Sequence, residues 1–373
     1  MRLDYTSLAA LLAAAEAAGK PLSELVLAQQ AEEMELPPAE VYGRMARRYG
    51  VMAESAVQGC DPGLRSASGL TGGGAAKMQA AVESGRSLTG PVLGGALTRA
   101  LAVSELNAAM GRIVAAPTAG SCGILPAALL TMEQEKGCSR RACVMALFTA
   151  SAVGMVIARN ASLAGAQGGC QAECGSAAAM AAAAVVELAG GAPAQVGDAV
   201  AIALKNVLGL VCDPVAGLVE VPCVKRNAAG VAGAFVAAEL ALAGIPSAIP
   251  PDEVIAAMKK VGDAMAPALK ETAEGGLAAT PTACRLRRQL LGRDGGCLAV
   301  YNSKIPSKAP ASAGSMWWVM VTTVRAGSRS RRLSMAWALA ASWALAASSR
   351  MMNRRPGRRQ APHDTERQSG RRR

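Results

Sequence analysis

Residues 159–188 read RNASLAGAQGGCQAECGSAAAMAAAAVVEL and join a glycine-containing loop to an alanine-rich run. Alanine has the highest helix propensity of all residues, so the run at 177–188 predicts an α-helix. Its small side chains suit close contact with other helices, which predicts that this helix lies at the centre of the molecule. The polar part at 159–176 predicts a loop that leads into it.

The rest of the composition also favours helices. The chain of 373 residues has only two phenylalanines, and strand-type alternation of Val, Ile, Thr and aromatic residues is scarce. Short helices are expected over residues 1–60, with breaks at 19–21 and at Pro37 and Pro38, because proline does not fit a helix interior. We therefore predict an all-α fold, with a compact helical domain over residues 1–293 and functional loops between its helices.

The formal net charge of +12 comes from one end of the chain. Residues 294–373 contain 15 Lys plus Arg and 3 Asp plus Glu, so the totals of 39 basic and 27 acidic residues leave 24 of each for residues 1–293. The domain is neutral, and we expect no nucleic acid as a partner. The basic tail at 294–373 fits either a divergent extension or a shifted reading frame, and it is expected to be poorly structured.

Neither apolar stretch of the chain predicts membrane association. The run at 8–18 follows Asp4, where a signal peptide needs positive charge, and Glu16 interrupts it. The run at 333–348 is shorter than the roughly 20 residues that a spanning helix needs. Ten cysteines without a secretory context indicate reduced thiols or metal ligands, which predicts a cytoplasmic protein.

Four polar loops that contain glycine or proline separate the apolar helical segments, at 60–74, 115–126, 159–176 and 209–227. Glycine permits backbone angles that other residues resist and lets backbone amides approach a ligand. Loops of this kind on a rigid scaffold can form one site from distant parts of the chain. The alternative, that they are ordinary connections between helices, fits the composition equally well.

Some of the cysteines lie where they could hold a metal, in or beside these loops: Cys170, Cys212 and Cys223. Two more lie close to them, Cys122 and Cys174. Others are in contexts where a lone cysteine is usually a small hydrophobic residue: Cys138, Cys143 and Cys284. The spacing alone is a weak signal for a cluster, since no C-x2-C pair and no ferredoxin-type run is present.

Several other site types are disfavoured by the sequence. Structural zinc sites prefer closely spaced cysteine pairs and often histidine, and the only histidine here is His363, in the tail. A Ser-His-Asp triad is therefore missing from the domain, and so is the commonest general base. No Walker loop is present, and no glycine pattern follows a strand as dinucleotide binding requires.

Over roughly residues 20–293 the sequence resembles the α chain of the two-subunit, iron–sulfur-dependent L-serine dehydratases. The matching motifs are SASGLTGG at 66–73, NAAMGRIVAAPTAGS at 107–121, NASLAGAQGGCQAE at 160–173, KNVLGLVCDPVAGLVEVPCVKRNA at 205–228 and GGLAATPT at 275–282. The last two cysteine motifs are long and specific. One departure is Gly74, where the family usually has an acidic residue after GLTGG.

The resemblance implies a lyase with a 4Fe–4S cluster held by Cys170, Cys212 and Cys223. Three ligands for four irons leave one iron open, and an open iron acts as a Lewis acid. L-serine is expected to bind this iron through its carboxylate and β-hydroxyl, lose water to give aminoacrylate, and yield pyruvate and ammonia. No pyridoxal phosphate is required, and a β chain is the expected partner in a hetero-oligomer.

The residues that handle the proton and the substrate follow from the same motifs. Lys77 and Lys225 are candidates for the general base, unless the β chain contributes it, and the alternative for each lysine is surface solvation. Arg226 is expected to neutralise the substrate carboxylate or the cluster. Hydroxyl, amide and backbone groups in the loops are candidate substrate contacts, with capping and turn chemistry as the alternative: Ser66, Ser68, Gly72, Gly73, Thr118, Ser121, Asn160 and Ser162.

Two competing functions stay open at this point. The same cluster could serve an iron–sulfur cysteine desulfidase or another hydro-lyase acting on a small amino or hydroxy acid. Alternatively, the basic tail at 294–373 could bind nucleic acid or anionic lipid while the domain only folds. The cluster-based lyase is favoured because the motifs lie in the domain and not in the tail.

Overall fold

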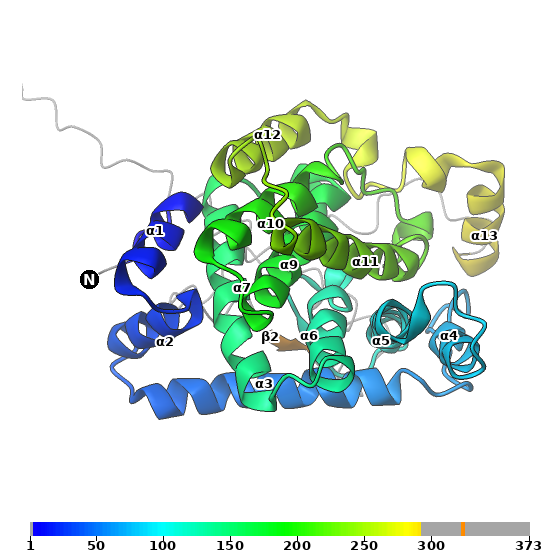
Figure 1. The fold of residues 1–373 in the computed structure, drawn as a ribbon. Coiled ribbons are helices and arrows are strands. Elements are labelled where there is room, and N and C mark those ends of the chain that lie inside the picture. Colours follow the sequence, from blue (N-terminus) through cyan, green and yellow to red (C-terminus); the bar gives the residue numbers. More distant parts are fainter. Residues whose placement is uncertain (1–2, 292–321, 325–373) are drawn as a thin grey trace, which may run out of the picture.

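The structure is a computed structural model that describes residues 3–291 and 322–324, and it confirms the all-α prediction (Figure 1). The α-helices of this described part are α1 (Leu8–Ala18), α2 (Leu22–Glu33), α3 (Pro38–Gln58), α4 (Gly74–Glu83), α5 (Gly90–Ala108), α6 (Ile124–Glu135), α7 (Arg140–Asn160), α8 (Gly165–Gly168), α9 (Ser176–Leu188), α10 (Pro193–Lys205), α11 (Cys223–Leu242), α12 (Pro251–Ala264) and α13 (Pro281–Leu291). Two short strands, β1 (Ile113–Ala115) and β2 (Thr322–Val324), pair antiparallel.

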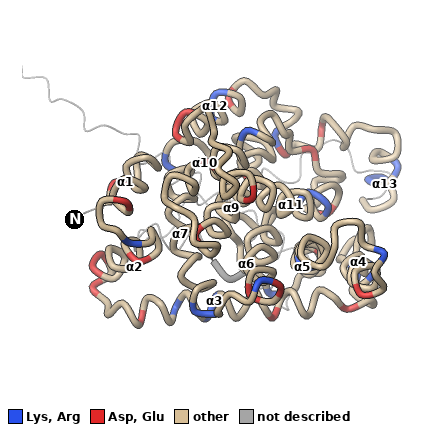
Figure 2. Tube along the Cα trace, in the orientation of Figure 1, with Lys and Arg blue, Asp and Glu red and all other residues tan. Residues whose placement is uncertain are grey.

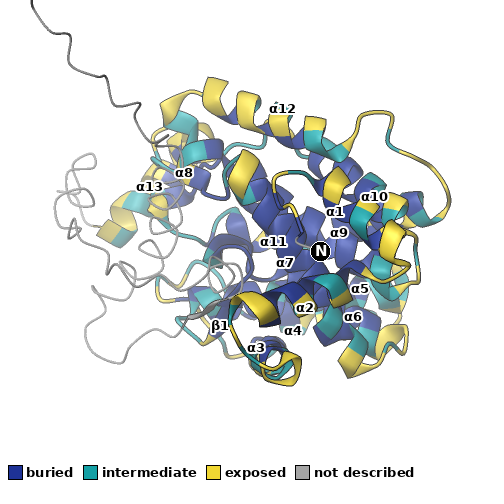
Figure 3. Ribbon diagram, turned by 90° about the vertical axis from the view of Figure 1, so that its left-hand side faces the viewer, coloured by how far each residue is buried: buried dark blue, intermediate teal, exposed yellow. Residues whose placement is uncertain are grey.

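Helix α9 is the centre of the molecule, as its alanine run predicts. It contacts α6, α7, α10 and α11, and its residues from Ser176 to Val186 are all buried. Figure 3 shows α9 and α7 almost entirely as buried ribbon, while the outer face of α12 is exposed. Because alanine side chains are short, the helices around α9 pack close to its backbone and fix the loops at its ends.

Helix α7 is long and apolar enough to cross a membrane by length and composition, and it is the only described helix that passes this test. In the structure 78% of its apolar window is buried inside the protein. A helix that is hydrophobic on all sides is expected in the core of a large domain. Its Ser139 N-cap accepts a hydrogen bond of 3.1 Å from Ala142 N.

The N-terminal helices begin and end where the sequence predicts breaks. Gly19 takes a left-handed conformation and ends α1, and α3 begins at Pro38, where proline is tolerated because the first helical amide needs no partner. Asp252, in the first turn of α12, accepts hydrogen bonds from Leu8 N at 2.7 Å and Ala9 N at 3.0 Å. This carboxylate caps α1 and joins the first helix to the twelfth.

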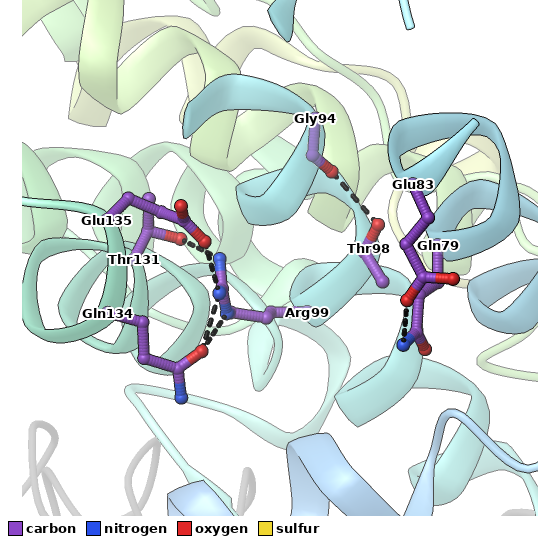
Figure 4. A network of polar contacts seen from close by, with 8 residues as sticks. All are labelled: Gln79, Glu83, Gly94, Thr98, Arg99, Thr131, Gln134 and Glu135. Carbon is purple, nitrogen blue, oxygen red and sulfur yellow. Dashed lines mark hydrogen bonds and ion pairs between the residues drawn. The ribbon is translucent and has the colours of Figure 1, made fainter. Parts of the chain in front are cut away.

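Arg99 joins α5 to α6 through a polar network (Figure 4). Its guanidinium donates to Thr131 Oγ1 at 3.0 Å and to Glu135 Oε1 at 2.8 Å, and it also contacts Gln134. In the same view the Thr98 hydroxyl donates to the Gly94 carbonyl within α5. These contacts hold the middle of α5 against the C-terminal part of α6.

Charges of both signs lie side by side on the outer helices α2, α3, α4 and α12 (Figure 2), in agreement with the neutral balance of residues 1–293. The predicted tail at 294–373, with its apolar run at 333–348 and His363, lies outside the described residues except for β2. The boundary at residue 293 stays a prediction.

Candidate active site

Cys170 lies at the start of a π-helical turn, η2 (Gln171–Gly175), which leads directly into α9. Gln171 ties this turn to the loop that carries Cys212. Its backbone N donates to Leu210 O at 3.0 Å, and its side-chain Oε1 accepts from Gly209 N at 2.9 Å. The first two cysteine motifs are therefore adjacent in space.

Cys212 is held by its own backbone. Its N donates to Leu269 O at 2.9 Å, and its O accepts from Glu271 N at 2.7 Å. Its sulfur faces Gly165, at the start of α8: a Cβ built on that glycine would stand 2.9 Å from Cys212 Sγ. Glycine at position 165 thus lets the backbone of α8 approach this thiol closely.

Cys223 is the first residue of α11, and Asn227 fixes this helix end to a third loop. The Asn227 amide donates to Cys223 O at 2.9 Å and to Gly120 O at 2.7 Å, and its oxygen accepts from Gly123 N at 2.8 Å. Asn227 is 1% exposed, so all of these bonds are buried. The loop before α6 and the third cysteine motif are therefore locked together.

The three thiols predicted as ligands are buried and lie within electrostatic range of each other. Cys170, Cys212 and Cys223 are 2, 4 and 8% exposed. Burial raises the pKa of the Cys212 and Cys223 thiols, and negative charge on Glu173 and Cys170 raises both further. At Cys170 the Cys174 thiol, 3.4 Å away, and then Arg226 outweigh burial and lower the pKa to about 7.

Arg226 lies beside this cysteine set, in the first turn of α11. Its Nη1 donates to Val211 O at 2.8 Å, and its Nη2 lies 2.9 Å from Asp213 Oδ1 in a largely buried ion pair. Burial lowers the pKa of Arg226, but the charges of Cys170 and Asp213 outweigh burial and raise it. The guanidinium thus supplies a fixed positive charge next to Cys170.

The donor set fits an iron–sulfur cluster. Three thiols from three loops converge, and two of them are costly to ionise in a buried site unless a cation is bound, because burial disfavours charge. Within the described residues no three His, Cys, Asp or Glu side chains are grouped tightly enough for one metal ion. A cluster of several irons is larger than one ion, and it does not require the thiolates to come so close.

The loop at 66–73 is joined to the third cysteine motif through Glu220. Glu220 Oε2 accepts from Ser68 Oγ at 2.8 Å and from Thr71 Oγ1 at 3.1 Å. Ser66 Oγ accepts from Thr71 N at 3.2 Å and lies 3.3 Å from Ser68 Oγ. Two predicted substrate contacts, Ser66 and Ser68, are thus brought to the segment that precedes Cys223.

The glycines of this loop are required by its shape. Gly72 and Gly73 both have positive φ, at 135° and 71°. A Cβ on Gly72 would stand 2.2 Å from Leu64 O, which no side chain can tolerate. Gly72 and Gly73, both predicted substrate contacts, therefore let this loop pass close to the backbone of residues 62–65.

Thr118 and Ser121 are buried and lie beside Glu173, on the loop that Asn227 holds. Their hydroxyl oxygens are 3.1 Å apart. Burial, together with Glu271 and Cys170, raises the pKa of the Glu173 carboxyl, while hydrogen bonds from Thr118 and from the Gly165 amide act against this. These two predicted contacts border the cysteine set.

Asn160 and Ser162 are less clearly part of the same group. Asn160 is exposed at the end of α7, and its amide donates to Thr6 O and Val156 O, both at 2.9 Å. Ser162 donates to Gln167 Oε1 at 2.8 Å and accepts from Ala164 N at 3.1 Å. Asn160 thus fastens the N-terminal segment, and its substrate contact stays a prediction.

The two candidate bases, Lys77 in α4 and Lys225 in α11, are both exposed. A lysine that acts as a base near neutral pH needs burial or nearby positive charge. The exposure of both side chains favours the solvated alternative in the chain as described, and their role as bases stays a prediction.

Three buried carboxylates were not singled out from the sequence. Glu105, Glu173 and Glu220 are 4, 9 and 4% exposed. Charged residues are almost never buried without partners, so an acid inside an apolar motif was the available signal: Glu173 in GGCQAEC and Glu220 in GLVEVPC.

Glu105 explains how Gly74 is accommodated. Its carboxylate accepts hydrogen bonds from Gly74 N at 3.0 Å and Ala75 N at 3.1 Å and so caps α4. A Cβ on residue 74 would stand 2.5 Å from Glu105 Oε1. A side chain at position 74 would require the Glu105 carboxylate to shift from this capping position.

Among the other cysteines of the described residues, only Cys174 contacts one of the three predicted ligands. The Cys122 and Cys143 thiols are fully buried and point to the backbone carbonyls of Val103 and Leu129. Cys284 is exposed. Cys174 lies one turn from Cys170 and contacts its sulfur, so it belongs to the immediate surroundings of the site.

Comparisons with a family model and with known proteins agree on one family. Residues 17–278 match the family described as serine dehydratase alpha chain. The chain is 54% identical over 271 residues to the probable L-serine dehydratase, alpha chain, of Bacillus subtilis, covering 73% of this chain and 90% of that protein. It is 44% identical over 273 residues to the L-serine dehydratase, alpha chain, of Peptoniphilus asaccharolyticus, covering 73% and 94%. An L-serine dehydratase of Streptomyces coelicolor matches 50% of this chain with 46% identity, over 41% of its own length.

Proposed function

This chain belongs to the serine dehydratase alpha chain family, and on that basis we propose that it is the α subunit of an L-serine ammonia-lyase. The reaction removes the α-proton and the β-hydroxyl of L-serine as water to give aminoacrylate. Aminoacrylate tautomerises to an imine, which water hydrolyses to pyruvate and ammonia. The relatives named as L-serine dehydratases support the substrate and the reaction class.

The observation that carries the mechanism is the convergence of three buried thiols from three loops. We propose that Cys170, Cys212 and Cys223 hold a 4Fe–4S cluster. When bound, the cluster would supply an iron without a protein thiolate, a Lewis acid that makes the serine hydroxyl a better leaving group.

The residues of the chain would orient the substrate. Arg226, fixed by Asp213, offers positive charge for the substrate carboxylate or for the thiolates. The hydroxyls of Thr118 and Ser121 lie beside Glu173, and Glu220 anchors the loop at 66–73 to the segment before Cys223. Their burial keeps water out and holds their hydrogen-bonding atoms in place.

We further propose that the base comes from a β chain in a hetero-oligomer, since Lys77 and Lys225 are exposed. The name alpha chain, which two relatives carry, supports a multi-subunit enzyme. The proposal includes a cytoplasmic enzyme that uses no pyridoxal phosphate and binds neither nucleic acid nor membrane.

The test is anaerobic reconstitution of the full chain with iron, sulfide and the β chain, followed by assay of pyruvate and ammonia. L-serine is expected to be converted, and an iron chelator is expected to stop the reaction while hydroxylamine, which traps pyridoxal phosphate, leaves it unchanged. L-cysteine and L-threonine are assayed in parallel. A faster reaction with cysteine and release of sulfide would support the desulfidase alternative, and turnover without iron would overturn the proposed mechanism.

A further inference from the structure

Glu173 lies close to the cysteine set. It lies on the π-helical turn between Cys170 and α9 and is 9% exposed. A Cβ built on Gly120 would stand 3.0 Å from Glu173 Oε2, and one built on Gly165 would stand 3.1 Å from it. The same point at Gly165 is 2.9 Å from Cys212 Sγ. The carboxylate and the proposed ligand sulfur therefore lie close together against the backbone of Gly165, and the absence of side chains at Gly120 and Gly165 permits this approach.

Glu173 has no ion-pair partner among the described residues, since the nearby Arg226 pairs with Asp213. Burial is the main cause of its raised pKa, followed by the negative charges of Glu271 and Cys170. A buried carboxylate of this kind is stabilised by a cation that enters the site.

Two hydrogen-bond donors lie near the carboxylate. The Thr118 hydroxyl and the Gly165 amide both act to lower its pKa, against the effect of burial. They belong to the loops at 115–126 and 159–176, so the chain offers the carboxylate polar neighbours but not a positively charged partner. A bound ammonium group would supply the missing positive charge.

We propose that Glu173 binds the α-ammonium group of the amino-acid substrate, a role that rests on the proposed function. In that function the hydroxyl and carboxylate of serine are used at the metal, and the ammonium group still needs an acceptor. A carboxylate forms strong charge-assisted hydrogen bonds with ammonium. Glu173 would therefore make the site select an amino acid over a hydroxy acid of the same shape.

The competing role for Glu173 is removal of the α-proton. The two roles differ in what a conservative change does to the kinetics: loss of the ammonium partner weakens substrate binding, whereas loss of a base lowers kcat at unchanged affinity. The experiment compares Glu173→Gln with Glu187→Gln in the iron-loaded full chain with its β chain. Glu187 lies at the opposite end of α9, where it accepts hydrogen bonds from Thr149 and Ser23.

Two measurements are made on each protein. The first is KM and kcat for L-serine. The second is calorimetric titration with L-alanine and with L-lactate, which keep the carboxylate but have no β-hydroxyl to eliminate. For Glu173→Gln we expect unchanged iron content, a KM for serine and a Kd for alanine raised roughly 10- to 100-fold, and unchanged lactate binding. Glu187→Gln is expected to match the wild type in all of these.

The inference is overturned if Glu173→Gln binds alanine as tightly as the wild type, or if only kcat falls. It is also overturned if the Kd of the wild type for lactate equals its Kd for alanine. A wild type that binds alanine selectively but forms no pyruvate from serine would instead overturn the proposed function, and the calorimetric comparison would still decide the role of Glu173.

Discussion

Ser68 Oγ donates a hydrogen bond of 2.8 Å to Glu220 Oε2, across 152 residues of chain. The same oxygen accepts from Thr71 Oγ1 at 3.1 Å. Because Glu220 lies three residues before Cys223, this carboxylate couples the position of the first glycine loop to the third cysteine motif.

Replacing Glu220 is therefore expected to loosen the loop at 66–73 and not the whole fold. For Glu220→Gln we expect a loss of about 1.5–3 kcal/mol of unfolding free energy, since the lost hydrogen bonds involve a charged group. The KM for L-serine is expected to rise with iron content unchanged. Urea unfolding and steady-state kinetics are the measurements, with the exposed Glu239→Gln in α11 as control.

A result with Glu220→Gln that equals the control in stability and KM would show that this contact does not position the loop. A loss of iron would mean that Glu220 supports the cysteine motif itself.

Glu105 is expected to be a stability residue. Glu105→Ala leaves Gly74 N and Ala75 N without their carboxylate acceptor at the start of α4. An N-terminal cap is worth about 0.5–2 kcal/mol, and loss of a buried partner costs about 1–3 kcal/mol. Thermal or urea unfolding checks this, and Glu83→Ala at the exposed end of α4 should stay within about 0.5 kcal/mol of the wild type. Equal stability of the two variants would contradict the capping role.

The site is expected to require glycine at position 165, because any side chain there would crowd Cys212 and Glu173. Its φ is not in the left-handed region, so alanine suits the backbone, but the added Cβ would meet Cys212 Sγ at 2.9 Å and Glu173 Oε2 at 3.1 Å. We expect Gly165→Ala to lower the iron content and to cost about 1–3 kcal/mol through overpacking.

The matched control is Gly233→Ala in α11, where a Cβ would meet nothing within 4 Å. It should leave iron content unchanged and stabilise the helix by up to about 1 kcal/mol. Iron determination on both variants is the measurement. Full iron loading of Gly165→Ala would show that the close approach of the Gly165 backbone to Cys212 is not needed for the cluster.

The helical fold could be predicted because its causes are local. Alanine propensity over 177–188 predicts α9, and the breaks near Gly19 and Pro38 follow from backbone chemistry within a few residues. The short pairing of β1 with β2 was not predicted, since three residues on each side carry no periodic signal.

The contacts within the site could be predicted only in part. The motifs indicated which loops meet, but the partners of Glu105, Glu173 and Glu220 depend on how distant segments pack, and no spacing along the chain reveals them. For Asn160 the motif predicted a substrate contact that the structure does not show. Asn160 lies at the exposed end of α7, and its amide donates a hydrogen bond to Thr6 O.

The central claim is that Cys170, Cys212 and Cys223 hold a cluster, and iron determination with Mössbauer spectroscopy on Cys212→Ser tests it most directly. Cys284→Ser, at an exposed position, is the control, and circular dichroism shows whether each variant folds. After anaerobic reconstitution the wild type and the control are expected to hold about four irons per chain with the spectrum of a 4Fe–4S cluster. Folded Cys212→Ser is expected to lose most of this iron. Retention of the full cluster signal in Cys212→Ser would contradict the account.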